Sequence, residues 1–469
     1  MKKVILFFLF SFLFGSESDF ETSGHVNFSY ISRLSNNSII NIPYRLSSID
    51  IVHQKNNISL FATLALEYQI RDENYFLESK NPQDFLFDLR ELYTTFSSNL
   101  YEFKIGKQIH SWGNVDDNSP LDNASAIDYY YIFLAGKERK IATFSTALDL
   151  YIGNLKLQTI ISPLHNTNRL PIGNDDFPVE LPLIPEKSNM MPIKGLGYEK
   201  GLYASYPFNY GEFSLSYFSG YDRIFNLSGV NVYGKGSDLS FTNIDILYGY
   251  RKTETYGLGA VLLQSLFNIR FDIGYFSTQD MNDSTDFIQR ESINTPTFYD
   301  SLHFSYPLKE KSVYVQKTIQ VECVLPFNVN LIAQYFTHDT LSYSSDSLPV
   351  DQEINIPNLE IDPDEMTPSN FFTPGLGVPL AFITNKAMLF SLNKNFLNNQ
   401  IKLSLTTMLD INTSNNKTDL HGSLNEFKAE YDIVQDFILL LGITKINGSN
   451  NVAFAENIKA GYSVAQSQT

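Results

Sequence analysis

The segment FNIRFDIGYFS (Phe267–Ser277) alternates between apolar and polar residues along its length. Because successive side chains of a β-strand point to opposite faces, this alternation predicts a strand with one apolar and one polar face. The apolar face carries Phe267, Ile269, Phe271 and Ile273. The polar face carries Arg270 and Asp272.

The same alternation recurs in IKLSLTTMLDI (401–411) and YEFKIGKQIH (101–110). Their apolar faces carry Leu403, Leu405, Phe103 and Ile105, and their polar faces carry Lys402, Asp410, Glu102 and Lys104. These strands are about 10 to 14 residues long, whereas strands of soluble proteins usually have ~5 or 6 residues. Their length fits the ~9 to 11 residues that cross a bilayer at a tilt. Since only a closed barrel pairs every backbone group in lipid, we predict an all-β transmembrane antiparallel up-and-down β-barrel.

The connections between strands alternate between short and long, as periplasmic turns and extracellular loops do in bacterial barrels. Short links lie near Asn56, Ser98, Gly153, Tyr210, Ser265, Phe327, Asn398 and Gln435. Long polar links lie at 34–43, 72–83, 111–139, 164–198, 221–252, 279–309, 339–379 and 412–421, with a short ninth at 447–451. This rhythm predicts 18 strands, with 16 as the alternative. Residues 239–250 also have strand character. We assign them to a hairpin within a loop, because a spanning strand there would make the number of strands odd, whereas bacterial barrels have an even number.

The N-terminus predicts export. Lys2 and Lys3 precede the apolar run Val4–Phe14, and small residues at Ser16 and Ser18 fit a cleaved signal peptide over residues 1–18. Residues 19–469 would then form the barrel, placed in the outer membrane of a Gram-negative bacterium. The run of apolar residues is too short for a membrane-spanning helix, which needs ~20 residues.

The composition agrees with an exported β protein and excludes one class of partner. Aromatic residues make up 14% of the chain and charged residues 18%, and Cys323 is the single cysteine. The formal net charge of -17 would repel nucleic acid, so we exclude it as a partner.

The polar faces of the predicted strands provide candidates for the lining of a water-filled path. Mixed charges facing each other across a pore select solutes by charge and dipole. The candidate lining residues are Asp88, Arg90, Glu102, Lys104, Arg270, Asp272, Lys402 and Asp410. Strict alternation would point Glu91 at lipid, so we expect a β-bulge or an interfacial position there. Strict alternation would also point Lys107 at lipid, but its long side chain could extend the ammonium to the membrane interface.

Three further features are open to more than one interpretation. The loops 164–198 and 339–379 are rich in proline, and the second is also acidic; either could fold inward and narrow the lumen, or remain at the surface. Trp112, the single tryptophan, follows a predicted strand, and we interpret it as an anchor at the membrane interface, with a ligand contact as the alternative.

The chain carries no phosphate-binding loop, no cysteine-pair metal pattern and no nucleophile elbow. Asp116 and Asp117 in one loop, with His338 and Asp339 in another, resemble only in residue type the aspartates and histidine of omptin-type rim proteases. We therefore expect no enzymatic activity, no cofactor and no metal site.

Several segments resemble a porin-like outer-membrane family of unknown function that is grouped with alginate-export-type barrels. The main one is DLRELYTTFSSNLYEFKIGKQIHSWGNVDDNSPLDN (88–123). LQTIISPLHNTNRLP (157–171), FSLSYFSGYDR (213–223) and LIAQYFTHDT (331–340) are similar to further strands of that family. The resemblance implies a large barrel that passes a small organic or apolar solute. One departure is the C-terminus, which ends in Gln468 and Thr469 where bacterial barrels commonly end in an aromatic residue.

The sequence thus predicts a porin-like channel for passive diffusion of small solutes, and the resemblance implies that these include hydrophobic or organic compounds. Its expected partners are outer-membrane lipid, the solute and the barrel assembly machinery. The first alternative is a surface adhesin with a plugged lumen, and the second is a hydrolase at the rim.

Overall fold

The computed structural model describes residues 19–448 except 41, 69–84, 133, 135, 172–184, 186, 194, 196, 236–237, 289–299, 346–371, 412, 415–416, 419–421 and 435. One sheet contains 17 of the described strands. These are β1 (Asp19–Val26), β2 (Tyr44–Lys55), β3 (Ile58–Tyr68), β4 (Phe85–Ser97), β5 (Tyr101–Gln108), β8 (Thr143–Ile152), β9 (Leu155–Ser162), β10 (Glu199–Phe208), β11 (Gly211–Tyr221), β14 (Lys252–Leu263), β15 (Phe267–Gln279), β17 (Lys311–Leu325), β18 (Val329–Ser344), β19 (Lys386–Phe396), β20 (Ile401–Asp410), β23 (Gly422–Val434) and β24 (Phe437–Gly448).

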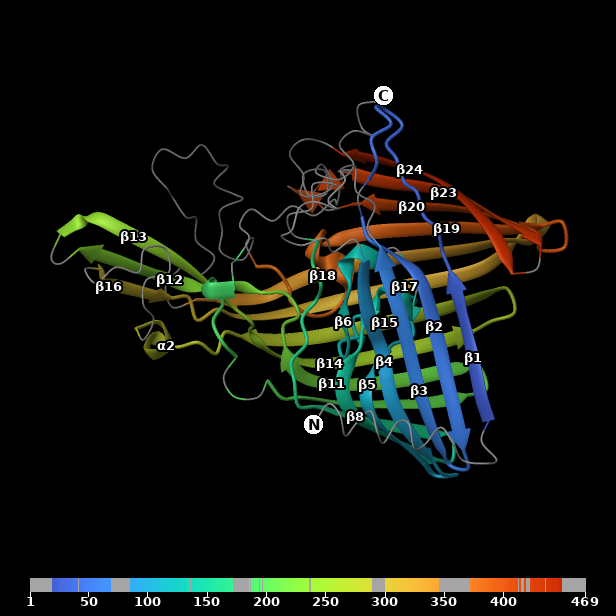
Figure 1. Cartoon of the computed structure of the whole chain (residues 1–469), viewed down its shortest axis with the longest axis horizontal. Coiled ribbons are helices and arrows are strands. Elements are labelled where there is room, and N and C mark those ends of the chain that lie inside the picture. Colours follow the sequence, from blue (N-terminus) through green and yellow to red (C-terminus); the bar gives the residue numbers. More distant parts are fainter. Residues whose placement is uncertain are drawn as a thin grey trace.

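The strands of this sheet follow an up-and-down order. Each pairs antiparallel with the strands before and after it in the sheet, from β1–β2 to β23–β24. The sheet curls so that β1 to β5 lie across from β14 to β18 (Figure 1). The predicted all-β, up-and-down architecture is confirmed. The predicted signal peptide and the strand expected beyond residue 451 lie outside the described residues.

The predicted rhythm of the links is also confirmed. All eight short links lie at the ends of hairpins within the sheet, and residues at positive φ form several of them, including Asn56 (φ 53°) and Phe327 (φ 64°). Between these hairpins run the long connections. Some boundaries differ: β1 ends at Val26, whereas the sequence placed the first long link at 34–43, and β18 continues to Ser344, whereas the sequence placed the start of a loop at 339. The strand continues because β17 pairs with it as far as Ser344.

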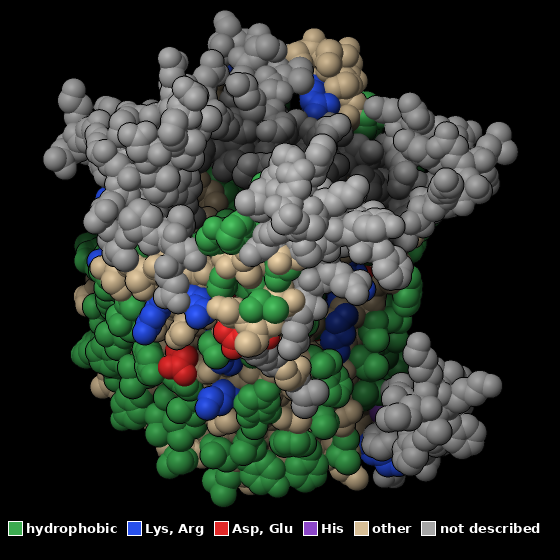
Figure 2. All heavy atoms as spheres, turned by 90° about the vertical axis from the view of Figure 1, so that its left-hand side faces the viewer, with side chains coloured by type: hydrophobic (Ala, Val, Ile, Leu, Met, Phe, Trp, Pro, Cys, Tyr) green, Lys and Arg blue, Asp and Glu red, His purple; other side chains and the backbone are tan. Residues whose placement is uncertain are grey.

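The two faces of the sheet have opposite character. Leu215 and Leu258 are 58% and 46% exposed on the outer face, while Asp272 and Gln320 are fully buried on the inner face. Figure 2 shows the end from which the long connections project, with hydrophobic side chains around its margin and charged side chains toward its middle. This is the reverse of a soluble protein, in which apolar residues are buried and charges exposed. An apolar medium around the sheet accounts for this reversed distribution of apolar and charged side chains.

We call the 17-stranded sheet the wall, and a smaller sheet stands apart from it. It contains β12 (Asn226–Lys235), β13 (Asp238–Gly249) and β16 (Asp300–Pro307), in the order β13-β12-β16, and projects to the left in Figure 1. The assignment of residues 239–250 to a hairpin outside the wall is therefore confirmed.

The remaining described elements are short. They are β6 (Ala126–Ile127), β7 (Lys140–Ile141), β21 (Thr413–Ser414), β22 (Lys417–Thr418), α2 (Ser284–Ile288), η2 (Tyr129–Tyr131), η3 (Gly136–Arg139), η4 (Lys187–Asn189), η5 (Pro326–Asn328) and η8 (Pro379–Phe382). Among the described residues, no helix has the length and apolarity to cross a membrane.

The expected bulge near Glu91 is present. The register of β3 and β4 shifts between Thr63, opposite Glu91, and Leu64, opposite Leu89, so that Arg90 is the extra residue. Because of this shift, both Arg90 and Glu91 are buried, and the carboxylate of Glu91 accepts a hydrogen bond from the backbone N–H of Ile109 at 2.9 Å. The bulge thus removes a carboxylate from the outer face.

Candidate functional site

The connection between β5 and β8, residues 109–142, folds into the interior, and we call it the inward loop. Its first half docks on β15. The backbone N–H groups of Asn114 and Val115 donate to the carboxylate of Asp272 at 2.8 and 2.9 Å, and the Asn114 amide donates to it at 3.0 Å. Further along, the Asn118 amide donates to Gln334 of β18 at 2.6 Å. Partners more than 150 positions away therefore hold this part of the loop.

The turn at Gly113 is possible because that residue is glycine. Its φ of +98° is unfavourable for other residues, and a Cβ there would lie 1.9 Å from the hydroxyl of Ser119. This tight turn brings the following N–H groups onto Asp272.

Trp112 lies differently from the prediction. Its side chain is 4% exposed and its ring stacks on Tyr203 at 5.7 Å, while its indole N–H donates to Gln158 at 2.5 Å. The residue is therefore packed on the inner face of the wall and is no interface anchor. The prediction failed because the chain turns inward after β5.

The second half of the inward loop reaches the opposite wall. Glu138 accepts hydrogen bonds from Arg45 of β2 at 2.5 Å and from Arg90 of β4 at 3.1 Å. The hydroxyl of Tyr131 donates to Glu67 of β3 at 2.7 Å. The inward loop thus crosses the interior from the β15–β18 wall to the β2–β4 wall.

A second segment, residues 372–385, also folds inward, and we call it the second inward segment. The fully buried Arg251 donates to the carbonyl of Thr373 at 2.5 Å, and the N–H of Val378 donates to Gln316 of β17 at 2.7 Å. Val378, Leu380 and other apolar residues of the segment pack on the inner faces of β18 to β24. This is the described end of the loop 339–379, so one of the two inward folds considered from the sequence is present. In the loop 164–198, residues 172–184, 186, 194 and 196 lie outside the described residues.

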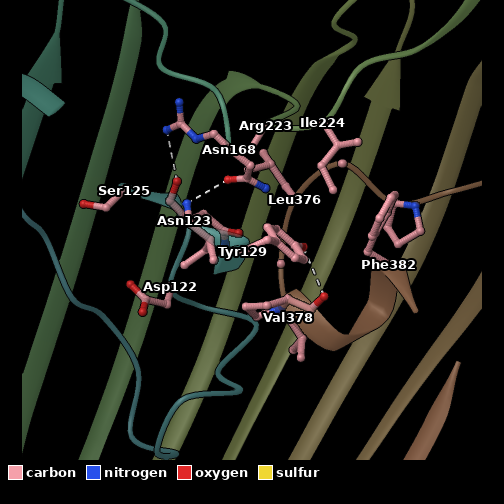
Figure 3. A pocket seen from close by; sticks show the side chains of 15 residues that line it. Asp122, Asn123, Ser125, Tyr129, Asn168, Arg223, Ile224, Leu376, Val378 and Phe382 are labelled. Carbon is pink, nitrogen blue, oxygen red and sulfur yellow. Dashed lines mark hydrogen bonds between the residues drawn. The ribbon is translucent and has the colours of Figure 1, made fainter. Parts of the chain in front are cut away.

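The two inward structures meet at a small cavity of about 20 Å³ (Figure 3). The hydroxyl of Tyr129 in the inward loop donates to the carbonyl of Pro379 at 3.1 Å, which joins the two. Asp122, Asn168 and Arg223 also line the cavity. A volume of this size holds about one water molecule. The two inward structures are therefore closely packed where they meet.

A buried cluster of charges lies beside this cavity, and its member Arg223 lines the cavity. Arg223 donates to both carboxylate oxygens of Glu199 at 2.9 and 2.8 Å, and His165 lies 2.9 Å from the same carboxylate. Burial lowers the pKa of His165, while its hydrogen bond to Glu199 acts in the opposite direction. The cluster is thus an arginine–carboxylate pair beside an imidazole that is neutral at pH 7.

A second cluster holds the inward loop near β3. Arg169 donates to Glu67 at 2.7 Å and lies 3.2 Å from the carboxylate of Asp128. Burial raises the pKa of Asp128 to about 6, although the positive charge of Arg169 opposes the rise. Asp128 therefore titrates close to neutral pH.

Four predicted lining residues hold the two inward structures in place. Arg90 binds Glu138, Asp272 binds the N–H groups at 114 and 115, Arg270 lies 3.1 Å from Asp116, and Asp410 accepts from Thr384 at 2.7 Å. These four residues bind protein groups of the interior.

Of the other four, Glu102, Lys104 and Lys402 lie nearer the short turns, and Asp88 lies near the start of β4. Glu102 and Lys104 form an ion pair at 2.9 Å, and Lys402 pairs with Glu430 at 3.3 Å. Asp88 lies 3.7 Å from Lys107 beside β5. Lining a solute path stays a prediction for all eight residues.

The structure does not join the residues considered for catalysis. Asp116 pairs with Arg270 and Asp117 lies 3.6 Å from Arg139, whereas His338 lies on β18 beside Gln316 at 3.4 Å and Asp339 pairs with Lys317 at 3.5 Å. Within the described residues, no contact links the two aspartates to His338 or Asp339, and no cluster of three or more His, Cys, Asp or Glu has a metal-binding arrangement.

No protein-family model and no curated protein matches this sequence. Among solved structures, OccAB4 of Acinetobacter baumannii is similar with a TM-score of 0.46 and 10% identity, covering 93% of this chain and 95% of that one. OpdK of Pseudomonas aeruginosa, solved with vanillate, has a TM-score of 0.45 and 9% identity over 92% of both chains. Another structure of OpdK, described as an outer membrane protein, has a TM-score of 0.45 and 10% identity, covering 92% of this chain and 94% of that one. The TM-scores and the sequence identities are both low, so the function of this chain rests on its own residues.

Proposed function

We propose that the protein is a channel of the outer membrane of a Gram-negative bacterium, through which small solutes diffuse passively. The observation that carries the proposal is the reversed distribution of side chains, with apolar residues outside and charges inside. A polar interior within an apolar outer band is the arrangement of a barrel with a water-filled lumen.

The passage runs between the inward loop and the second inward segment. These two structures leave a cavity of about 20 Å³ where they meet, so the passage is narrow at this point. Movement of either one widens the passage. The hydrogen bond from Tyr129 to the Pro379 carbonyl and the contacts of Asp272 with the inward loop oppose that movement.

The proposal includes several parts that the sequence suggests. They are export through a signal peptide at residues 1–18, insertion of residues 19–469 by the barrel assembly machinery, and contact with outer-membrane lipid. A relation to alginate-export-type barrels, with a hydrophobic or organic solute, belongs to the same proposal. We propose no enzymatic activity.

The experiment is single-channel recording from the purified, folded protein in planar bilayers. We expect current steps that grow in the Tyr129→Ala variant, because this change removes the side chain that joins the two inward structures. Tyr256→Ala, which removes an exposed ring from the outer face, serves as the control and should leave the steps unchanged. The absence of current above leak in all three proteins would contradict the channel.

A surface adhesin with a filled lumen is the second candidate. The sheet of β12, β13 and β16 favours it, because this sheet projects from the wall and carries the exposed rings of Phe304 and Tyr306, 46% and 50% exposed. A folded protein without conductance that still attaches to host cells, and loses attachment when both rings are changed to Ser, would favour this candidate.

A further inference from the structure

The ladder between β4 and β5 is the shortest of the described ladders in the wall, and the next shortest, β8–β9 and β9–β10, have seven pairs each. The ladder between β4 and β5 has six residue pairs, from Leu92 opposite Lys107 to Ser97 opposite Glu102. The ladder on the other side of β4 has eleven pairs and reaches Phe85. In the described part of the chain, residues 85–91 of β4 therefore have a strand partner on one side only. We call the stretch between residues 85–91 and 107–110 the lateral seam.

The length of the β4–β5 ladder indicates that the seam lies within the apolar band. Six strand residues rise about 20 Å, which corresponds to about 14 Å of membrane thickness at a tilt of ~45°. The apolar band of outer-membrane barrels is ~25 Å tall. The β4–β5 ladder thus covers only part of the band, and the seam occupies the remainder on the side of the long loops.

Side chains occupy the seam in place of a backbone ladder. By register, Lys107 lies opposite Leu92 on the outer face of β5. Its ammonium turns into the seam, where it donates to the backbone carbonyl of Leu89 and lies 3.7 Å from the carboxylate of Asp88, which is on the inner face. An ammonium from the lipid side thus reaches a carboxylate of the lumen side through the wall. Lys107 therefore bridges the seam, and does not extend to the membrane interface.

The inward loop covers the seam from inside. Arg90 donates to the carbonyl of Lys137 at 2.7 Å and to Glu138 at 3.1 Å, while the ammonium of Lys137 lies 3.8 Å from Glu91. Displacement of η3 from Arg90 and Glu91 would connect the lumen with the seam. Since hydrogen bonds of side chains hold this closure, it opens without breaking a strand ladder.

The residues beside the seam indicate what would pass. On the lipid side, Phe85 and Phe87 are 56% and 67% exposed and Leu89 is half-buried next to them, so the outer border of the seam is apolar. Within the seam, the ammonium of Lys107 can exchange Asp88 for another carboxylate. An alkyl chain with an acidic head group matches both features.

The geometry points to the lateral seam as a route by which a single-chain amphiphile with an acidic head group leaves the lumen for the outer membrane. This inference rests on the proposed barrel in the membrane and adds to it a solute class and an exit through the wall. The tail passes between Phe87 and Leu89 on β4 and the end of β5, while Lys107 binds the head group. Lipid-exposed gaps in a strand ladder are otherwise unfavourable, because unpaired backbone groups cost several kcal/mol in lipid.

Closing the seam covalently tests the inference. In a Cys323→Ser background, Asp88→Cys and Lys107→Cys are cross-linked in the folded protein with a short bis-methanethiosulfonate reagent. Uptake of radiolabelled oleate is measured in a bacterial host that lacks its own outer-membrane fatty-acid transporter, and conductance is measured in planar bilayers. We expect cross-linking to reduce oleate uptake to the level of cells without the protein, to leave conductance as it was in the same double-cysteine variant before cross-linking, and to be reversed by a reducing agent.

Two variants provide the control and a test that keeps Lys107. Leu258→Cys with Ile273→Cys, direct partners in the complete β14–β15 ladder, should take up oleate equally before and after cross-linking. Leu89→Trp fills the lipid side of the seam with Lys107 in place and should lower uptake, whereas Leu258→Trp on the outer face should not.

The outcomes separate the inference from the proposed function. Oleate uptake that neither the cross-link nor Leu89→Trp reduces, or no uptake by the unmodified protein, would overturn the lateral route while normal conductance upheld the channel. Seam-dependent uptake without any conductance would support the lateral route and refute the open channel.

Discussion

The attachment of the inward loop to the wall depends most directly on Asp272, and its removal has a calculable effect. One carboxylate oxygen accepts two backbone N–H groups at 2.8 and 2.9 Å, from Asn114 and Val115, and the other accepts the Asn114 amide at 3.0 Å. In Asp272→Asn, an NH₂ group replaces one acceptor, so at least one buried donor loses its partner. A hydrogen bond to a charged group contributes ~1.5–3 kcal/mol, and a buried unsatisfied donor costs ~1–3 kcal/mol. Docking of the loop therefore weakens by about 3–5 kcal/mol.

This change is expected to increase the undocked population of the loop by roughly 100- to 4000-fold, since 1.4 kcal/mol corresponds to a factor of ten. Single-channel recording should show more frequent or larger openings than in the unmodified protein. Glu426→Gln is the matched control, because it also removes one negative charge from the interior while its described partners, Lys428 at 2.8 Å and Thr444 at 3.5 Å, belong to the wall. Equal recordings from the two variants would refute the assignment of Asp272 as the anchor of the loop.

Three further changes have definite expected outcomes. In Gly201→Ala, the new Cβ would lie 2.3 Å from the ring of Trp112, so the single tryptophan must move; its fluorescence emission should shift to the red, and an unchanged spectrum would contradict its position. Arg223→Gln leaves the carboxylate of Glu199 buried without its guanidinium partner and should cost ~3–5 kcal/mol, measured as a lower temperature of unfolding on heat-modifiability gels; no change would argue against the cluster. The pKa of Asp128 is raised from 3.8 to about 6 in the folded protein, so the stability it contributes is complete below pH 3.8 and is lost as the pH rises through about 6. Asp128→Asn should therefore flatten the fall in unfolding temperature between about pH 4 and pH 7, and parallel pH profiles would contradict this.

The described wall follows closely from the sequence. Alternation in segments such as Phe267–Ser277 identified the outer and inner faces, and residues such as Asn56 and Phe327 marked the hairpin turns. Both signals are local, because a side chain's face depends on its position along its own strand and a tight turn on a few consecutive residues. The bulge at Arg90 was foreseen for the same reason, since Glu91 conflicted with the local pattern.

The candidate site was predicted less completely. The sequence pointed to Asp272 and Arg90 as lining residues, but the structure shows them binding Asn114 and Glu138 of the inward loop. The cluster around Arg223 was missed, because an arginine after the end of a strand has no local pattern that distinguishes it. The long connection 111–139 was recognised as a loop, but nothing in its local sequence showed that it crosses the interior.

The sequence by itself thus predicted an N-terminal signal peptide and a chain of long amphipathic strands joined by alternating short and long links. The tertiary structure alone decided that the inward loop crosses the interior, that Trp112 is buried, and that the wall has a seam beside Lys107. The physical reason is the range of the interactions. Strand faces follow a two-residue period, whereas Asn114 meets Asp272 and Tyr129 meets Pro379 only after the sheet has curled and brought distant segments together.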